Sequence, residues 1–191
     1  MLFSEEYYHD LIAKLGLPEM PISKVTYQGK NILDNKSFRS DFFKISKKLL
    51  QYVSYNNISQ LMEANFPIET IQELHAGLFP ENITIYLKKP IEYGGKLEFS
   101  NMFLIRTRPF KQMLDSFIDE QILSFNREHP GYDKNNGFLL PTELYVPNPD
   151  GIVFLPALKG FAGAGGNTSA DKMSEIGSTM FLKNSGRFWW V

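Results

Sequence analysis

Residues 80–118 restrict the possible folds of this chain more than any other segment. Their sequence is PENITIYLKKPIEYGGKLEFSNMFLIRTRPFKQMLDSFI. Apolar and polar residues alternate over 83–87, and a continuous apolar run covers 102–105, so the segment predicts two strands. The Gly-Gly pair between them predicts a loop. Apolar residues at helical spacing then predict a helix over 109–126, with Pro109 in its first turn.

The rest of the chain predicts helices on the N-terminal side and short strands on the C-terminal side. Helices are expected over 4–15 with Ser4 as the cap, over 37–55, from about 57, and from Pro67 to Gly77. Short strands are expected at 25–27, 143–146 and 152–155, and a short helix at 169–176. The predicted fold is α+β, with a helical N-terminal region (1–79), a ββα hairpin-helix core (80–126) and a loop-rich C-terminal section with short strands (127–191). We expect these three regions to form one compact domain.

Composition narrows the classes of function. Of 191 residues, 43% are hydrophobic and 14% aromatic, which is enough for a packed core. The net charge of −1 gives no global basic field for nucleic acid, so any such binding needs a local patch. The absence of cysteine excludes disulfides, Cys-ligated zinc and thiol nucleophiles. We expect no membrane span, and a protein that is either cytoplasmic or exported without a signal peptide.

The central segment resembles the core of HNH (His-Me finger) nucleases of bacterial toxin type. Many of these read roughly His-His-Lys-x-Pro-Leu, Gly-Gly, Ser-Asn-Leu-x-Leu-Ile and Pro-x-His. The present chain reads YLKKPI at 86–91, GG at 94–95, SNMFLI at 100–105 and PFK at 109–111. The resemblance implies a β-hairpin and a helix that together would hold one divalent metal, with a histidine as general base.

The residues that would perform the chemistry are missing. Tyr86 and Leu87 stand in place of the His-His pair, Lys111 replaces the helix histidine, and only the signature residue Asn101 remains. Tyrosine is a poor base at neutral pH, leucine has no ligand atom, and a lysine ammonium repels a metal ion. The resemblance therefore implies a fold kept without catalysis, with no metal or cofactor, in which Asn101 bridges the loop.

A local positive charge marks the same segment. Its central part, residues 88–111, carries six basic residues against Glu92 and Glu98, a local balance of +4, and these are Lys88, Lys89, Lys96, Arg106, Arg108 and Lys111. Such a set can bind nucleic acid or an acidic protein partner, although a solvated hairpin face is an equally good interpretation.

Three hypotheses follow for the function. The first is a bacterial toxin or effector domain with a degenerate HNH-like core that binds a macromolecule, with a cognate inhibitor or a secretion-apparatus protein as further partners. The second is an active metal-dependent nuclease with an unconventional site, which would require His75, His129, Asp133 and Asn101 to converge.

The third hypothesis is an interaction module of a secretion or phage-like assembly. It would dock through the Gly-rich loop 159–166 and the aromatic tail 188–191. The individual histidines are expected to be surface or cap residues, and the Asp115–Asp119 pair is expected to be solvated on the polar face of its helix.

Overall fold

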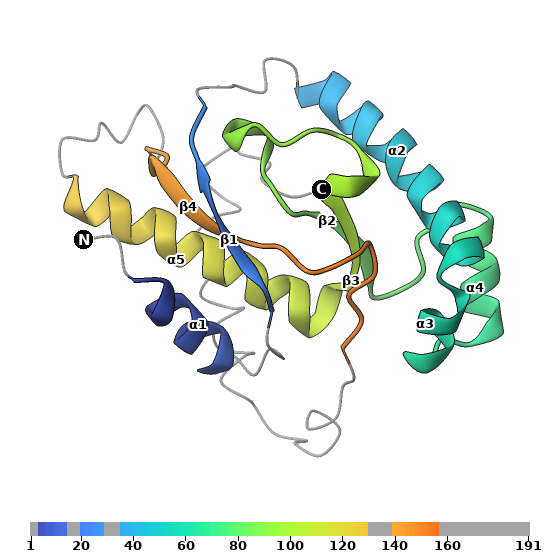
Figure 1. The fold of residues 1–191 in the computed structure, drawn as a ribbon. Coiled ribbons are helices and arrows are strands. Elements are labelled where there is room, and N and C mark those ends of the chain that lie inside the picture. The colour runs from blue at the N-terminus through green and yellow to red at the C-terminus, as the bar shows by residue number, and fades with distance from the viewer. Residues whose placement is uncertain (1–3, 15–19, 29–34, 130–138, 157–191) are drawn as a thin grey trace.

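The computed structural model describes residues 4–14, 20–28, 35–129 and 139–156 (Figure 1). The described helices are α1 (Glu5–Lys14), α2 (Asn35–Asn56), α3 (Ile58–Glu63), α4 (Ile68–His75) and α5 (Gln112–Glu128). The described strands are β1 (Ile22–Thr26), β2 (Ile83–Leu87), β3 (Met102–Arg106) and β4 (Glu143–Pro147). The predicted α+β class is confirmed. The Gly-rich loop 159–166, the helix expected at 169–176 and the tail 188–191 lie outside the described residues.

Local signals place most element boundaries. Ser4 precedes α1 as expected, and its Oγ accepts a hydrogen bond of 3.3 Å from the amide of Tyr7. Gly77 follows α4 with a φ of 70°, a left-handed conformation that favours glycine at a helix end. The regular part of α5 begins later than predicted. Pro109 lies in the preceding turn, Thr107–Lys111, where Arg108 has an extended conformation.

The described residues contain two antiparallel pairs of strands, one between consecutive strands and one between strands far apart in the sequence. β2 and β3 form a hairpin in which Ile83 lies opposite Arg106 and Leu87 opposite Met102. β1 pairs with β4, from the far end of the described chain. The strand predicted at 152–155 is wrong, since these residues form only one parallel bridge, between Val153 and Leu104. Two hydrogen bonds hold it, from Leu104 N to Ile152 O (2.8 Å) and from Phe154 N to Leu104 O (2.9 Å).

The β2–β3 hairpin lies between two hydrophobic cores. Side chains alternate across a strand, so neighbouring residues face opposite sides. Tyr86, Phe103 and Ile105 join the core formed with α1, α5, β1 and β4. Residues on the other face, which are Ile83, Ile85, Leu87, Met102 and Leu104, join the core formed with α2, α3 and α4. Burial on both faces explains why β3 reads as a continuous apolar run.

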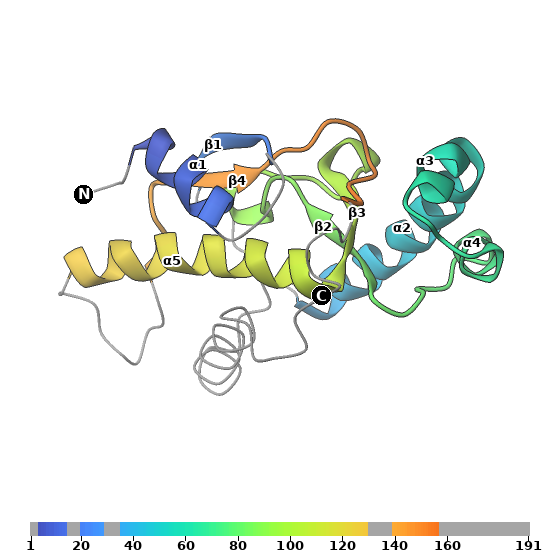
Figure 2. The same cartoon turned by 90° about the horizontal axis from the view of Figure 1, so that it is seen from below.

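Helix α5 is attached to the second strand pair by a buried glutamine. Figure 2 shows α5 running along one side of the sheets, with α2, α3 and α4 grouped beyond the hairpin. Gln121 Nε2 donates to the carbonyl oxygen of Tyr145 (2.9 Å), and Gln121 Oε1 accepts from the amide of Tyr145 (2.8 Å). This pair of bonds satisfies a buried side-chain amide and fixes β4 against α5. The core on this side draws residues from all three predicted regions, including Tyr8, Phe117 and Leu144.

We expect Gly95→Ala to destabilise the protein by about 3 kcal/mol, since the new Cβ would meet backbone that cannot easily move. It would lie 1.9 Å from the carbonyl oxygen of Lys89. Gly151→Ala is the control. Gly151 has a φ of 70° but no atom within 4 Å of its added Cβ, so we expect a loss of about 1 kcal/mol. Urea denaturation measures both, and equal losses would contradict the close packing at Gly95.

Candidate functional site

Asn101 closes the loop of the hairpin through its side chain. Its Oδ1 accepts a hydrogen bond from the amide of Lys89 (2.8 Å). Its Nδ2 donates to the carbonyl oxygens of Lys89 (2.9 Å) and Lys96 (3.0 Å). Asn101 is itself buried, so these three bonds satisfy backbone groups that water reaches poorly. The expected bridging role of Asn101 is confirmed.

We expect Asn101→Asp to be more destabilising than Asn101→Ala, although aspartate is nearly the same shape as asparagine. The aspartate would place an acceptor oxygen against the two carbonyl oxygens that now receive the Nδ2 protons. Loss of these bonds should cost about 2 to 4 kcal/mol at pH 7 for the aspartate variant. Thermal unfolding of both variants tests this, and an aspartate variant as stable as the wild type would exclude the Nδ2 bonds as a structural requirement.

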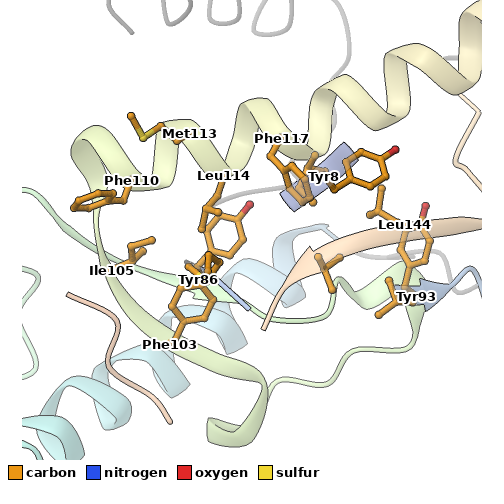
Figure 3. Packing of buried hydrophobic residues seen from close by; sticks show 14 of the residues in the cluster. Tyr8, Tyr86, Tyr93, Phe103, Ile105, Phe110, Met113, Leu114, Phe117 and Leu144 are labelled. Carbon is orange, nitrogen blue, oxygen red and sulfur yellow. The ribbon is translucent and has the colours of Figure 1, made fainter. Parts of the chain in front are cut away.

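The two residues in the His-His positions point to opposite cores. Tyr86 extends from the hairpin toward α5 and lies among Phe103, Leu114 and Phe117 in the same core (Figure 3). Leu87 is buried in the core on the other face. Of this pair of positions, only residue 86 therefore faces α5, the helix that begins directly after Lys111.

Tyr86 and Lys111 both interact with the same carboxylate on α5. Lys111 Nζ lies 2.6 Å from Asp115 Oδ2, and the Lys111 side chain is only 15% exposed. Tyr86 and Asp115 are also coupled electrostatically, since the Asp115 charge raises the pKa of Tyr86. We name Tyr86, Lys111, Asp115 and Asp119 the hairpin–helix cluster. Two of its members, Tyr86 and Lys111, stand at positions where the HNH motif that the segment resembles has histidines.

Burial controls the protonation of the cluster. Burial raises the pKa of Tyr86 well above its usual range, and the Asp115 and Asp119 carboxylates raise it further. Burial also raises the pKa of Asp115, against the opposing effect of Lys111. Burial and the Asp115 charge raise the pKa of Asp119 to about 7. The expectation that Asp115 and Asp119 are solvated is therefore wrong, because both carboxyl groups border the buried side of α5.

The chemistry of the cluster differs from that of a nuclease site. A protonated tyrosine with a raised pKa cannot activate water as a base near neutral pH. The Lys111 ammonium already occupies Asp115 Oδ2, and its positive charge opposes a metal ion at this oxygen. Within the described ranges, no three His, Cys, Asp or Glu side chains are grouped closely enough to hold a metal ion.

Asp119→Asn should stabilise the protein at pH 8 by about 1 to 2 kcal/mol and have little effect at pH 4. The folded-state pKa of about 7 lies above the value for an unfolded chain, so this carboxyl group reduces stability as the pH rises toward 7. Asparagine removes that dependence. Denaturation at a series of pH values measures it, with Glu120→Gln, next to it on α5, as the control. A difference between Asp119→Asn and the wild type that does not vary with pH would contradict the raised pKa.

The six predicted basic residues do not form one patch. Arg106 faces the helical side, where its Nη2 donates to the carbonyl oxygen of Ala64 (2.9 Å) and its guanidinium lies 4.8 Å from the centre of the Phe66 ring. Lys111 is held in the hairpin–helix cluster. Arg108 is exposed at the other end of the hairpin from the loop.

Three of the six remain together at the loop of the hairpin. Lys88 and Lys89 follow β2 and are half-buried, while Lys96 is exposed. Burial lowers the pKa of Lys88, and the nearby Asp150 carboxylate partly opposes this. Of the six residues predicted to bind a partner, only Lys88, Lys89 and Lys96 therefore lie at this end of the hairpin. We name these three residues the loop lysines.

The residues of the unconventional nuclease hypothesis are not brought together. His75 ends α4, and its Nε2 lies 2.8 Å from the Tyr55 hydroxyl group. His129 follows α5 and stacks on Phe125, with ring centres 4.1 Å apart. The two helix ends lie at opposite ends of the described structure (Figures 1 and 2). Asp133 lies outside the described residues.

Comparison with known proteins returns no relative. No protein family, curated protein or solved structure matches the chain. Within the described part of the chain, no helix combines the length and the apolar character needed to span a membrane.

Proposed function

We propose that the protein is a bacterial toxin- or effector-type domain whose HNH-like hairpin and helix bind a macromolecule and no longer cut nucleic acid. The observation that supports this most directly is the fate of the three histidine positions. Lys111 forms an ion pair with Asp115, and Tyr86 is buried and electrostatically coupled to the same carboxylate. Leu87 is buried in the core on the other face. The side chains at the former reaction centre therefore serve the fold.

The retained parts of the motif support a shared ancestry with that family. Asn101 ties the loop together, and Gly95 lies too close to the Lys89 carbonyl oxygen for any side chain. These are the residues that shape the hairpin, whereas the missing ones would bind metal or move protons. The toxin or effector setting is inferred from the resemblance alone.

The loop lysines are the surface through which binding is proposed. They lie on a loop made rigid by Asn101, so their backbone positions are fixed before any partner arrives. A fixed group of cations favours an anionic partner, which is either the phosphate backbone of nucleic acid or an acidic protein such as a cognate inhibitor.

The test combines cleavage and binding with the purified chain. We expect no cleavage of plasmid DNA or RNA with Mg²⁺, Mn²⁺, Ni²⁺ or Zn²⁺. We expect salt-sensitive binding to labelled oligonucleotides or to poly-L-glutamate, weakened about 10-fold in a Lys88→Gln/Lys89→Gln/Lys96→Gln variant at low salt. The Lys24→Gln/Arg127→Gln variant, which removes exposed cations from β1 and α5, should bind like the wild type.

Other outcomes separate the remaining hypotheses. Cleavage that EDTA abolishes would overturn the proposal in favour of an active nuclease. Absence of both cleavage and binding to either polyanion would also overturn it, and would leave the interaction module, for which light scattering should then detect self-assembly or a stoichiometric protein complex.

A further inference from the structure

Helix α2 carries a concentration of positive charge outside the hairpin. Its sequence, NKSFRSDFFKISKKLLQYVSYN, contains five basic residues and one acidic residue, a local charge of +4 in a chain of −1. The apolar side of the helix is already used, since Leu49, Leu50 and Val53 are fully buried in the core on the helical side of the hairpin. The charged side therefore faces away from that core.

Aromatic rings lie among these cations. Phe43 is 51% exposed and Tyr52 is 44% exposed. Positions 44, 48 and 52 follow one line of the helix surface, so Tyr52 lies in line with Lys44 and Lys48. Phe43 and Lys47 follow a separate line, and Phe43, nine residues before Tyr52, lies at the opposite edge of the charged side. The Nζ of Lys47 lies 5.1 Å from the centre of the Phe43 ring.

The lysines on this face remain available to a ligand. Lys44 is 70% exposed, and its ion pair with Asp41 (3.5 Å) is also exposed, a type of pair that contributes little to stability. Lys48 is exposed one turn further along. Binding of an anion to either ammonium group therefore does not require a buried interaction to be broken.

The α2 face continues into the hairpin loop. The Tyr52 ring lies 5.5 Å from the ring of Phe99, which is three residues after Lys96. Both views of the fold place α2 beside this loop (Figures 1 and 2). The Tyr52–Phe99 contact thus joins two segments that both carry cations, which are α2 with Lys48 and the hairpin loop with Lys96.

We propose that the exposed face of α2 binds single-stranded nucleic acid, with Lys44 and Lys48 at the phosphates and Tyr52 stacked against a base. An exposed ring in line with cations suits this ligand because its bases are free to stack, while those of a duplex are not. A membrane surface fits less well, since an interfacial helix inserts its apolar side, which α2 buries in the protein. This inference rests on the proposed binding function, names its partner and adds a second surface.

The experiment measures fluorescence anisotropy of labelled dT20, an RNA 20-mer and a 20-base-pair duplex. A Lys44→Gln/Lys48→Gln variant should bind the single strands about 10-fold more weakly than the wild type in 50 mM salt, and should reduce the slope of log Kd against log salt by about 1.4. The Lys24→Gln/Arg127→Gln variant removes the same charge elsewhere and should leave both quantities unchanged. Circular dichroism checks that each variant is folded.

A second pair of variants tests stacking separately from charge. Tyr52→Leu should weaken single-strand binding about 5-fold or more with the salt slope unchanged, while Tyr52→Phe keeps the ring and should bind like the wild type. A loss with Tyr52→Phe equal to that with Tyr52→Leu would overturn the stacking role.

Failure of this inference is distinguishable from failure of the proposed function. If the loop-lysine variant loses binding and the Lys44→Gln/Lys48→Gln variant does not, the α2 face is excluded and the hairpin proposal stands. Tighter binding of the duplex than of single strands overturns the single-strand assignment. If the protein binds poly-L-glutamate but no nucleic acid, or binds anionic vesicles as strongly as single strands, the α2 face has a different partner. Either result would also overturn the single-strand assignment.

Discussion

The structure depends on a hairpin that is buried on both of its faces. β2 and β3 are the only strands of the described chain that contribute to both hydrophobic cores. Such a position requires apolar residues at nearly every strand position and a loop that closes without exposing unpaired backbone groups. Asn101 meets the second requirement by bonding to Lys89 and Lys96 across the loop. The placement of α5 on one side and of α2 on the other follows from this central element.

The elements whose signals are local could be predicted from the sequence. The Gly-Gly loop, the apolar run at 102–105 and the helical periodicity of α2 each depend on a few neighbouring residues, and each element lies where it was expected. The pairing of β1 with β4 could not be predicted. Ile22 and Pro147 are opposite each other in that pair, and two five-residue strands so far apart in the chain carry no signal that identifies the partner.

The candidate site was only partly predictable, because the sequence shows how many charged residues the segment has but not which atoms their side chains contact. Asn101 was found through the resemblance to the HNH motif, which retains this residue, and its side chain bonds to both arms of the loop. Arg106 was assigned to a binding surface, but its partner is the Ala64 carbonyl oxygen in the segment after α3, which no local pattern reveals. Lys111 and Asp115 were a detectable pair, because residues four apart on a helix are neighbours. The electrostatic coupling of Asp115 to Tyr86 was not detectable, because Tyr86 comes from another element.

The shared hairpin has a consequence for how the molecule loses its structure. Tyr86 and Leu87 are adjacent residues, yet one anchors the core beside α5 and the other the core beside α2. Opening either core removes the support of one side of the same two strands, and a two-stranded ribbon is at most marginally stable without such support. The described parts of the chain should therefore unfold in one cooperative transition. A destabilising change in the core beside α2 should then lower the free energy of unfolding of α5 as much as a change in the core beside α5 itself.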